Sequence, residues 1–296
     1  MLTEESKGGQ LARPSWSVER RLEFIDFRLY WDGHVNRSDL ISHFGVSVPQ
    51  ASADLSRYQE AAPQNVVYDK SGKAYVSTPT FRPAFIQPSA DAYLAELRLL
   101  SSGILSQELA SVLHSPEFSV MPILRRRLAP EMLRRVLQAI RSKLALEVRY
   151  QSINRPEPIW RWLAPHALGF DGFRWHIRAW CHNHADFRDF VIARILEVRG
   201  TMPSEADAST DEGWHRSVTL EIGPHPKLAG GAREAIELDY GMENGVVAIT
   251  TRVCLSTYFE RSLGLDLDHA HVPPDRQQLV LLNREEVEKA RAGTTC

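Results

Sequence analysis

The sequence predicts an α+β protein of several domains, and three observations lead to this prediction. Its 296 residues are enough for two or three separate hydrophobic cores. Apolar residues recur at helical spacings in residues 17–58 and 90–144, whereas residues 144–195 alternate between apolar and polar as strands do. The last third mixes both patterns, so we expect helices and antiparallel strands grouped into distinct domains.

The composition is that of an ordinary globular chain, with 43% hydrophobic and 24% charged residues. The net charge of −2 hides an acidic excess in residues 201–296, so a nucleic-acid surface is expected only in the first two thirds. Three scattered cysteines fit no disulfide framework. Because neither a secretory signal nor an apolar run of about 18 residues is apparent, we expect a cytoplasmic protein.

The pattern of helix caps and turns predicts a helix-turn-helix near the N-terminus. A first helix begins at Ser17 and ends at Asp32-Gly33, and a second, capped by Ser38, ends at Phe44. After a turn at Gly45, Ser47 caps a third helix, which carries Pro49 in its first turn. The N-terminal residues of such a third helix can contact base edges in the major groove of DNA.

A β-hairpin with a basic tip follows the third helix. Residues 66–68 and 74–76 read as its strands, and they lie at the position of a wing. We predict that side chains of the third helix contact bases or phosphates and that lysines of the tip contact phosphate. The predicted DNA contacts are Ser47, Gln50, Ser52, Arg57, Lys70 and Lys73. The alternative is a helical subdomain that binds no nucleic acid, since Asp54 would repel phosphate if it faced the groove.

Residues 81–143 are predicted to form a helical linker. A proline-punctuated segment, 81–88, precedes one helix over 90–111 and a second over 130–144. The run Arg125-Arg126-Arg127 suits either a DNA contact or, more often, a solvated helix face.

Several short antiparallel strands between residues 144 and 195 predict a small β-barrel. Asp171-Gly172 marks a hairpin turn, and Phe187 to Ile195 reads as the last strand. Arginines and histidines are interleaved here with aromatic residues, a combination that suits a flat, anionic ligand.

Strand alternation places Arg174, His176 and Arg178 on one face of this barrel. Arg188 and Arg194, from the last strand, are expected to close that face. The predicted ligand contacts are Tyr150, Ser152, His166, Arg174, His176, Arg178, Arg188, Phe190 and Arg194. The alternative is that these arginines pair with nearby acidic residues on a wet surface.

Residues 163–195 resemble a WYL domain, a bacterial regulatory module named for a Trp-Tyr-Leu tripeptide. Trp175-His176-Ile177 stands at the tripeptide, Leu163-x-Pro165 precedes it, and Arg188-Asp189-Phe190 and Ala193-Arg194-Ile195 resemble the Arg-x-Phe and Asp-Arg-Ile ending. The departures are histidine for tyrosine, isoleucine for leucine, and Ala193 where an acid is usual.

Together with the winged helix-turn-helix and a C-terminal extension, nearly the whole chain is similar to WYL repressors of phage-defence islands, the BrxR and CapW type. The resemblance implies an Sm-like or SH3-like barrel, a homodimer on an operator, and control of repression by a ligand in the barrel. Nucleotides or nucleic-acid fragments are the ligands it suggests.

The last third predicts a β-α-β-like module. We expect strands at 218–222, 245–255 and 279–282, and helices at 226–234 and 258–263. An acidic module is poorly suited to touch DNA, so it is assigned to dimer or ligand-gate contacts. The predicted divisions are a flexible tail (1–14), the winged helix-turn-helix (15–80), the helical linker (81–143), the WYL barrel (144–202) and an α/β dimerisation module (214–290).

These observations favour a homodimeric repressor that binds an inverted-repeat operator under the control of an anionic effector. The rival is an accessory protein whose barrel grips single-stranded nucleic acid constitutively. Cys181 with its neighbouring histidines lacks the second ligand cluster of a structural zinc site, and no catalytic arrangement is apparent. We therefore expect neither an enzyme nor a cofactor.

Overall fold

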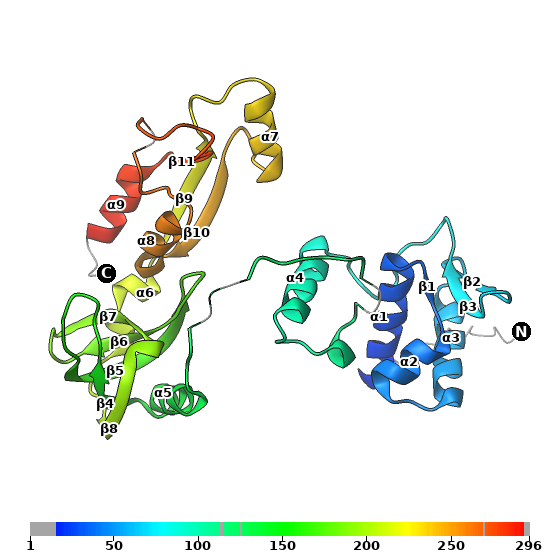
Figure 1. Cartoon of the computed structure of the whole chain (residues 1–296), viewed down its shortest axis with the longest axis horizontal. Helices are drawn as coiled ribbons and strands as arrows, with labels where there is room; N and C mark the ends of the chain where they lie inside the picture. The colour runs from blue at the N-terminus through cyan, green and yellow to red at the C-terminus, as the bar shows by residue number, and fades with distance from the viewer. Residues whose placement is uncertain (1–15, 113–114, 123, 125, 269, 293–296) are drawn as a thin grey trace, which may run out of the picture. The chain divides into compact units, whose positions relative to one another are not determined.

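A computed structural model describes residues 16–112, 115–122, 124, 126–268 and 270–292. The chain forms two compact units, residues 1–123 and 124–296, here called the N-terminal unit and the C-terminal unit (Figure 1). The predicted tail and Arg125 of the basic run lie outside the described residues.

The N-terminal unit has the predicted order of helices and hairpin. Its described helices are α1 (Trp16–Trp31), α2 (Arg37–Phe44), α3 (Val48–Ala61) and α4 (Ala90–Ser101), with a 3-10 turn η1 (Gln107–Leu109). The strands β1 (His34–Val35), β2 (Val66–Asp69) and β3 (Ala74–Ser77) form an antiparallel sheet in the order β1-β3-β2. Apolar side chains from α1, α2, α3 and β2 form one buried core, which fixes α3 against the other helices.

The cap of α2 differs from the prediction. Asn36, not Ser38, caps this helix: its side chain accepts a hydrogen bond from Asp39 N, and the Asp39 carboxylate accepts one from Asn36 N. This reciprocal capping box satisfies two helix-end donors, which a cap at Ser38 would not. Gly45 then ends α2 at φ 64°, a conformation that glycine adopts without strain.

The linker is held to the helix-turn-helix by a buried carboxylate of α1. Asp26 Oδ2 accepts hydrogen bonds from the backbone N–H groups of Ala84, Phe85 and Ile86 at 2.8–3.1 Å, and its Oδ1 accepts one from the Tyr58 hydroxyl. Since Tyr58 belongs to α3, the Asp26 side chain joins the linker to the helix that is predicted to contact DNA bases. The following helix α4 ends at Ser101 rather than near 111, because Gly103 (φ 66°) turns the chain there.

The C-terminal unit begins with helix α5 (Pro130–Ser142) packed on a five-stranded antiparallel sheet (Figure 1). The strand order is β7-β6-β5-β4-β8, with β4 (Leu144–Tyr150), β5 (Ile159–Phe170), β6 (Trp175–Cys181), β7 (Asp186–Val191) and β8 (Ile195–Pro203). A 3-10 turn η2 (Ile192–Arg194) separates β7 from β8. Within the described residues the two edge strands, β7 and β8, do not pair with each other, so the predicted closed barrel is not confirmed.

Two strand boundaries in this sheet were predicted incorrectly. Residues 159–170 form one long strand, and a register shift at residues 165–167 lets it pair with both neighbours. Strand β8 was not predicted, because most of its side chains are exposed and its sequence lacks an apolar alternation. It pairs with β4 and extends to Pro203, beyond Ile195, where the last predicted strand ends.

A smaller sheet forms the end of the C-terminal unit. Its order is β10-β9-β11, with β9 (Ser217–Pro224), β10 (Val247–Arg252) and β11 (Leu279–Leu281). Helices α7 (Gly231–Asp239), α8 (Val253–Ser262) and α9 (Arg284–Ala292) supply side chains to its core. The short turns η3 (Ala208–Thr210) and α6 (Glu212–His215) connect the two sheets.

Three helix boundaries in this region differ from the prediction. Helix α7 begins at Gly231 instead of Pro226, because the chain around His225 is bonded to the segment before β11. Helix α8 begins at Val253 inside the predicted strand, since burial of Val253 and Cys254 against the sheet outweighs their preference for strands. Helix α9 was not predicted, because Val287 is its only buried residue among the described side chains and one apolar position forms no helical pattern.

Candidate functional site

Helix α3 presents one face to the core and another to solvent. Ala51, Leu55 and Tyr58 are buried, and Asp54 lies among them, fully buried. Arg21 of α1 pairs with Asp54, with its Nε 2.6 Å from Oδ2. Asp54 therefore points away from the surface where it would repel phosphate.

The predicted base contacts on α3 lie in different environments. Ser47 caps the helix and is exposed, and its hydroxyl accepts from Gln50 N. The Gln50 amide donates to Asp54 Oδ1 at 3.0 Å, so this group is engaged within the protein. Ser52 donates to Val48 O at 3.0 Å, while Arg57 is exposed. Ser47 and Arg57 are thus the most accessible of the four.

One exposed cation beside α3 was missed by the sequence reasoning. Arg37, in the first turn of α2, donates from Nη1 to Ser52 Oγ at 3.5 Å. This contact places its guanidinium next to the solvent face of α3. The available signal was an arginine directly before Ser38, at the start of the second predicted helix.

The hairpin of β2 and β3 carries Lys70 and Lys73 at its exposed tip, as predicted. Asp69 accepts a hydrogen bond from Ser71 N at 2.8 Å and shapes this turn. Together with Arg37 and Arg57, the two lysines form what we call the basic face. None of these four side chains has an ion-pair partner among the described residues, whereas Arg21 and Arg28 are buried and paired.

In the C-terminal unit the structure divides the predicted ligand residues between two faces of the large sheet. Strand register pairs Arg188 with Ala179 and Phe190 with Ile177, and directly paired residues share a face. His176 and Arg178 alternate with these residues and point to the other face. The prediction that Arg188 closes the face of His176 and Arg178 is therefore wrong.

The first face has a cationic and aromatic end. Tyr150 and Phe190 meet edge to face with ring centroids 5.2 Å apart, and the guanidinium of Arg161 lies 5.3 Å and 5.5 Å from their centroids. The Tyr150 hydroxyl accepts from Val191 N at 3.1 Å. Arg188 shares this face and contacts Asp186 at 3.4 Å. We call Tyr150, Arg161, Arg188 and Phe190 the cationic end.

Arg161 is the residue of this cluster that sequence reasoning missed. It is 6% exposed, its Nε has no hydrogen-bond partner, and it forms no ion pair with any described residue. Burying an unpaired guanidinium costs free energy, and an anion bound beside Arg161 would reduce this cost. The available signal was its position between Trp160 and Trp162.

Arginines of the cationic end act on the nearby His184. Partial desolvation and the charges of Arg188, Arg161 and Arg155 lower the pKa of the nearby His184. Two further predicted residues lie along the adjoining loop. Ser152 is half-buried and accepts from Asn154 N, and Arg194 accepts through its carbonyl from Gln151 N.

On the second face, Arg178 is the centre of a buried ionic network. Its Nε and Nη2 donate to Asp211 at 2.7 Å and 2.9 Å, and Nη1 lies 3.4 Å from Asp189. His166 Nε2 is 2.9 Å from Asp211 Oδ2, and the Tyr258 hydroxyl donates to Asp189. Arg178 is thus saturated by carboxylates, and the network joins the large sheet to α6 and α8.

The two carboxylates of this network have pKa values shifted in opposite directions. Burial disfavours the charged form of Asp211, but hydrogen bonds from Arg178 and His166 hold its pKa below the ordinary value. Burial raises the pKa of Asp189, a shift that Arg178 opposes. A Cβ on Gly213 would lie 2.8 Å from Arg178 Nη2, so a larger residue at this position would require the guanidinium to shift.

The remaining predicted residues belong to the hairpin between β5 and β6. Asp171 accepts hydrogen bonds from Arg174 Nε at 2.8 Å and pairs with His176 Nε2 at 2.9 Å. Burial opposes the charge of Asp171, but these bonds and the backbone N–H of Phe173 bring its pKa to about 2. The alternative in which the predicted arginines pair with nearby acids therefore describes Arg174 and Arg178 well, and Arg188 also contacts Asp186.

Neither a metal cluster nor a membrane span is found where the structure describes the chain. No group of three or more His, Cys, Asp or Glu side chains in that part is arranged to hold a metal ion. None of the helices there is both long and apolar enough to cross a bilayer.

Comparison with known families divides the chain in the same order as its folded parts. Residues 17–99 match the winged helix-turn-helix domain of the BrxR transcriptional regulator, residues 131–199 the WYL domain, and residues 217–287 the BrxR C-terminal dimerization domain. The resemblance inferred from the WYL-like residues is confirmed.

Curated relatives align along nearly the whole chain. The DNA-binding transcriptional repressor CapW of Stenotrophomonas maltophilia is 42% identical, covering 96% of this chain and 95% of its own. The CapW repressors of Escherichia coli strain KTE188 and Pseudomonas aeruginosa are 40% and 41% identical over 96% and 95% of this chain, and 94% of each of theirs. These names agree with the expectation of a regulator that is not an enzyme. The chain therefore belongs to the CapW family, with a winged helix-turn-helix, a WYL domain and a C-terminal domain in that order.

Proposed function

We propose that this protein is a cytoplasmic, homodimeric transcriptional repressor that binds an inverted-repeat operator. The observation that carries the proposal is the basic face, four exposed cations beside and beyond α3 with no carboxylate partner among the described residues. Free cations at this position are available for phosphate, which supplies most of the affinity of DNA-binding proteins. Family membership and the C-terminal dimerization domain support a dimer with two such faces.

An anionic effector, a nucleotide or a short nucleic acid, controls this binding from the cationic end. Arg161 and Arg188 supply charge for phosphate, and the rings of Tyr150 and Phe190 border the same cluster. The effector acts only if it favours one dimer arrangement by a few kcal/mol, since equal affinity for both shifts nothing. The proposed target, from the resemblance to BrxR and CapW repressors, is a phage-defence operon.

Footprinting with the purified protein on its own promoter region tests the repressor. The expected result is two protected half-sites related by an inverted repeat, at moderate salt. Loss of protection when Arg57 is changed to glutamine locates the contact on α3. Absence of any protected site contradicts the proposal.

The rival function, a constitutive binder of single strands, is favoured by the same cationic end. It predicts that Arg188→Ala and Arg194→Ala weaken all nucleic-acid binding. A repressor with an effector site predicts unchanged operator affinity and a lost effector response. Anisotropy measurements on operator duplex and on single strands separate the two.

A further inference from the structure

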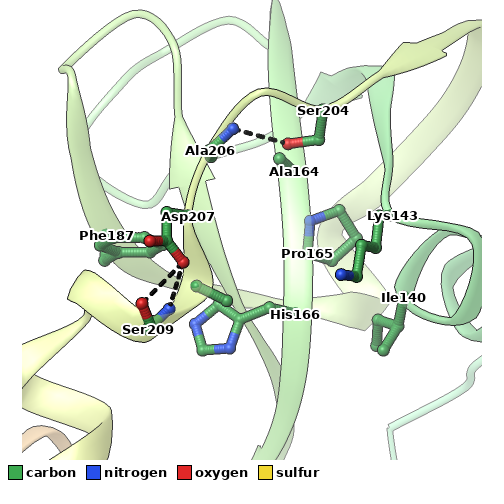
Figure 2. Close-up of a pocket in the computed structure, with 11 residues that line it drawn as sticks. Ile140, Lys143, Ala164, Pro165, His166, Phe187, Ser204, Ala206, Asp207 and Ser209 are labelled. Atoms are coloured by element: carbon green, nitrogen blue, oxygen red, sulfur yellow. Dashed lines mark hydrogen bonds between the residues drawn. The ribbon is translucent and has the colours of Figure 1, made fainter.

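A cavity of about 500 Å³ lies in the C-terminal unit (Figure 2). Its floor is β5 with Pro165 and His166, together with Phe187 of β7. The end of α5 forms one wall with Ile140 and Lys143, and the segment 204–209 forms the opposite wall. This volume is within the range of small-molecule sites, roughly 300–1,000 Å³. The cavity shares no residue with the cationic end.

The lining combines an apolar body with one available charge. Ile140, Pro165 and Phe187 offer apolar surface, and Figure 2 shows Lys143 with its ammonium directed toward Pro165. The Lys143 ammonium has no hydrogen bond or ion pair with any residue that the structure describes. The Lys143 ammonium is therefore available to bind the charged group of a ligand.

The other polar groups of the lining are already engaged. Ser204 Oγ accepts from Ala206 N at 3.2 Å, and Asp207 Oδ1 accepts from Ser209 N and Oγ at 2.9 Å and 2.7 Å. His166 Nε2 is bonded to Asp211. Asp207 also brings a negative charge near Lys143, so the formal charges of these two side chains cancel and only the immediate surroundings of the ammonium are cationic.

We propose that this cavity is a second effector site, for a small amphipathic monoanion such as an aromatic carboxylate. One local cation suits one negative charge, and the nearby Asp207 carboxylate disfavours the several charges of an oligonucleotide. The volume holds a flat ring against Phe187 and Pro165 with the carboxylate at Lys143. This assignment does not depend on the effector proposed for the cationic end.

The cavity is also placed to influence the C-terminal domain. Its wall at 204–209 includes the first two residues of η3, and Asp211, the N-cap of α6, follows two residues later. His166 lines the cavity and holds the same Asp211 that binds Arg178. A ligand that shifts the 204–209 segment therefore acts on the network joining the large sheet to α6 and α8. The response is a change in dimer arrangement rather than competition with DNA.

The test uses 2-naphthoate as the probe, with the full chain and ligand-observed saturation-transfer NMR. Lys143→Gln is expected to weaken binding by about fivefold, as for a partly exposed ion pair. Ala206→Phe, which fills the cavity, should abolish binding, whereas Lys289→Gln on the exposed face of α9 and Arg161→Gln should leave it unchanged. Circular dichroism and the melting temperature without probe establish that each variant folds.

Three outcomes overturn the proposal. The first is that the probe does not bind at millimolar concentration, and the second is that Lys289→Gln and Lys143→Gln weaken binding equally. The third is that Arg161→Gln loses binding, which would place the probe at the cationic end. If Ala206→Phe fails to fold, the comparison of Lys143→Gln with Lys289→Gln still decides. Failure here leaves operator footprinting unaffected, so the two proposals are judged separately.

Discussion

Replacing Arg178 by methionine tests the buried network that joins the large sheet to the C-terminal domain. The Arg178 side chain is 2% exposed and donates two short hydrogen bonds to Asp211 and a longer one to Asp189. Arg178→Met keeps much of the side-chain volume but leaves two buried carboxylates without a cation. Removing one partner of a buried pair costs roughly 3–5 kcal/mol, a large share of the ~5–15 kcal/mol that stabilises a typical domain.

The assay is urea unfolding of the full chain followed by circular dichroism. For a slope of about 2 kcal/mol per molar urea, the midpoint of the C-terminal unit should fall by about 2 M. The matched control is Arg188→Met, because Arg188 is 41% exposed and its contact with Asp186 is 3.4 Å long. That exposed pair contributes less than about 1 kcal/mol.

A second variant distinguishes the ion pair from lost packing. Adding Asp211→Asn to Arg178→Met removes one unpaired charge and keeps the N-cap of α6, so part of the lost stability should return. If Arg178→Met unfolds at the same urea concentration as Arg188→Met, the network does not stabilise the unit and the reasoning fails.

Three further predictions concern the DNA surface, the linker and pH. Lys73→Gln should weaken DNA binding for all sequences and reduce the slope of log affinity against log salt by about 0.9 for the lost phosphate contact. An unchanged slope in anisotropy titrations would show that Lys73 does not contact phosphate. Asp26→Asn should lower the free energy of unfolding of the N-terminal unit by about 2 kcal/mol and speed amide exchange at residues 84–86; unchanged exchange means that the carboxylate does not anchor the linker. The pKa of Asp171 falls from 3.8 to about 2 on folding, so the ionised carboxylate stabilises the fold fully above pH 3.8, and this stabilisation is lost as the pH drops toward 2. The urea midpoint of Asp171→Asn should therefore depend less on pH in this range than that of the wild type.

The elements predicted well were those specified by local sequence. Ser47 caps α3 and accepts from Gln50 N, Gly45 ends α2, and the lysines of the hairpin lie at its tip. Each depends on residues within a few positions of one another, where caps, turns and alternation act.

The site was predicted less completely because it depends on register and on distant partners. Alternation along β6 grouped His176 with Arg178 correctly, but the pairing of Arg188 with Ala179 places Arg188 on the opposite face. The saturation of Arg178 follows from Asp211, which lies 33 residues away in the sequence. The burial of Arg161 beside Tyr150 likewise requires β4 and β5 to be paired, and no pattern in either strand alone indicates it.

The most direct test of effector control is the affinity of a labelled operator duplex measured with and without a short phosphorylated oligonucleotide. The wild-type protein should change its operator affinity by at least about tenfold, the equivalent of about 1.4 kcal/mol. Arg161→Gln should bind the operator normally and lose this response, whereas Arg149→Gln, an exposed arginine on the neighbouring strand, should retain it. An equal response in wild type and Arg161→Gln, or no operator binding by the wild type, contradicts the account.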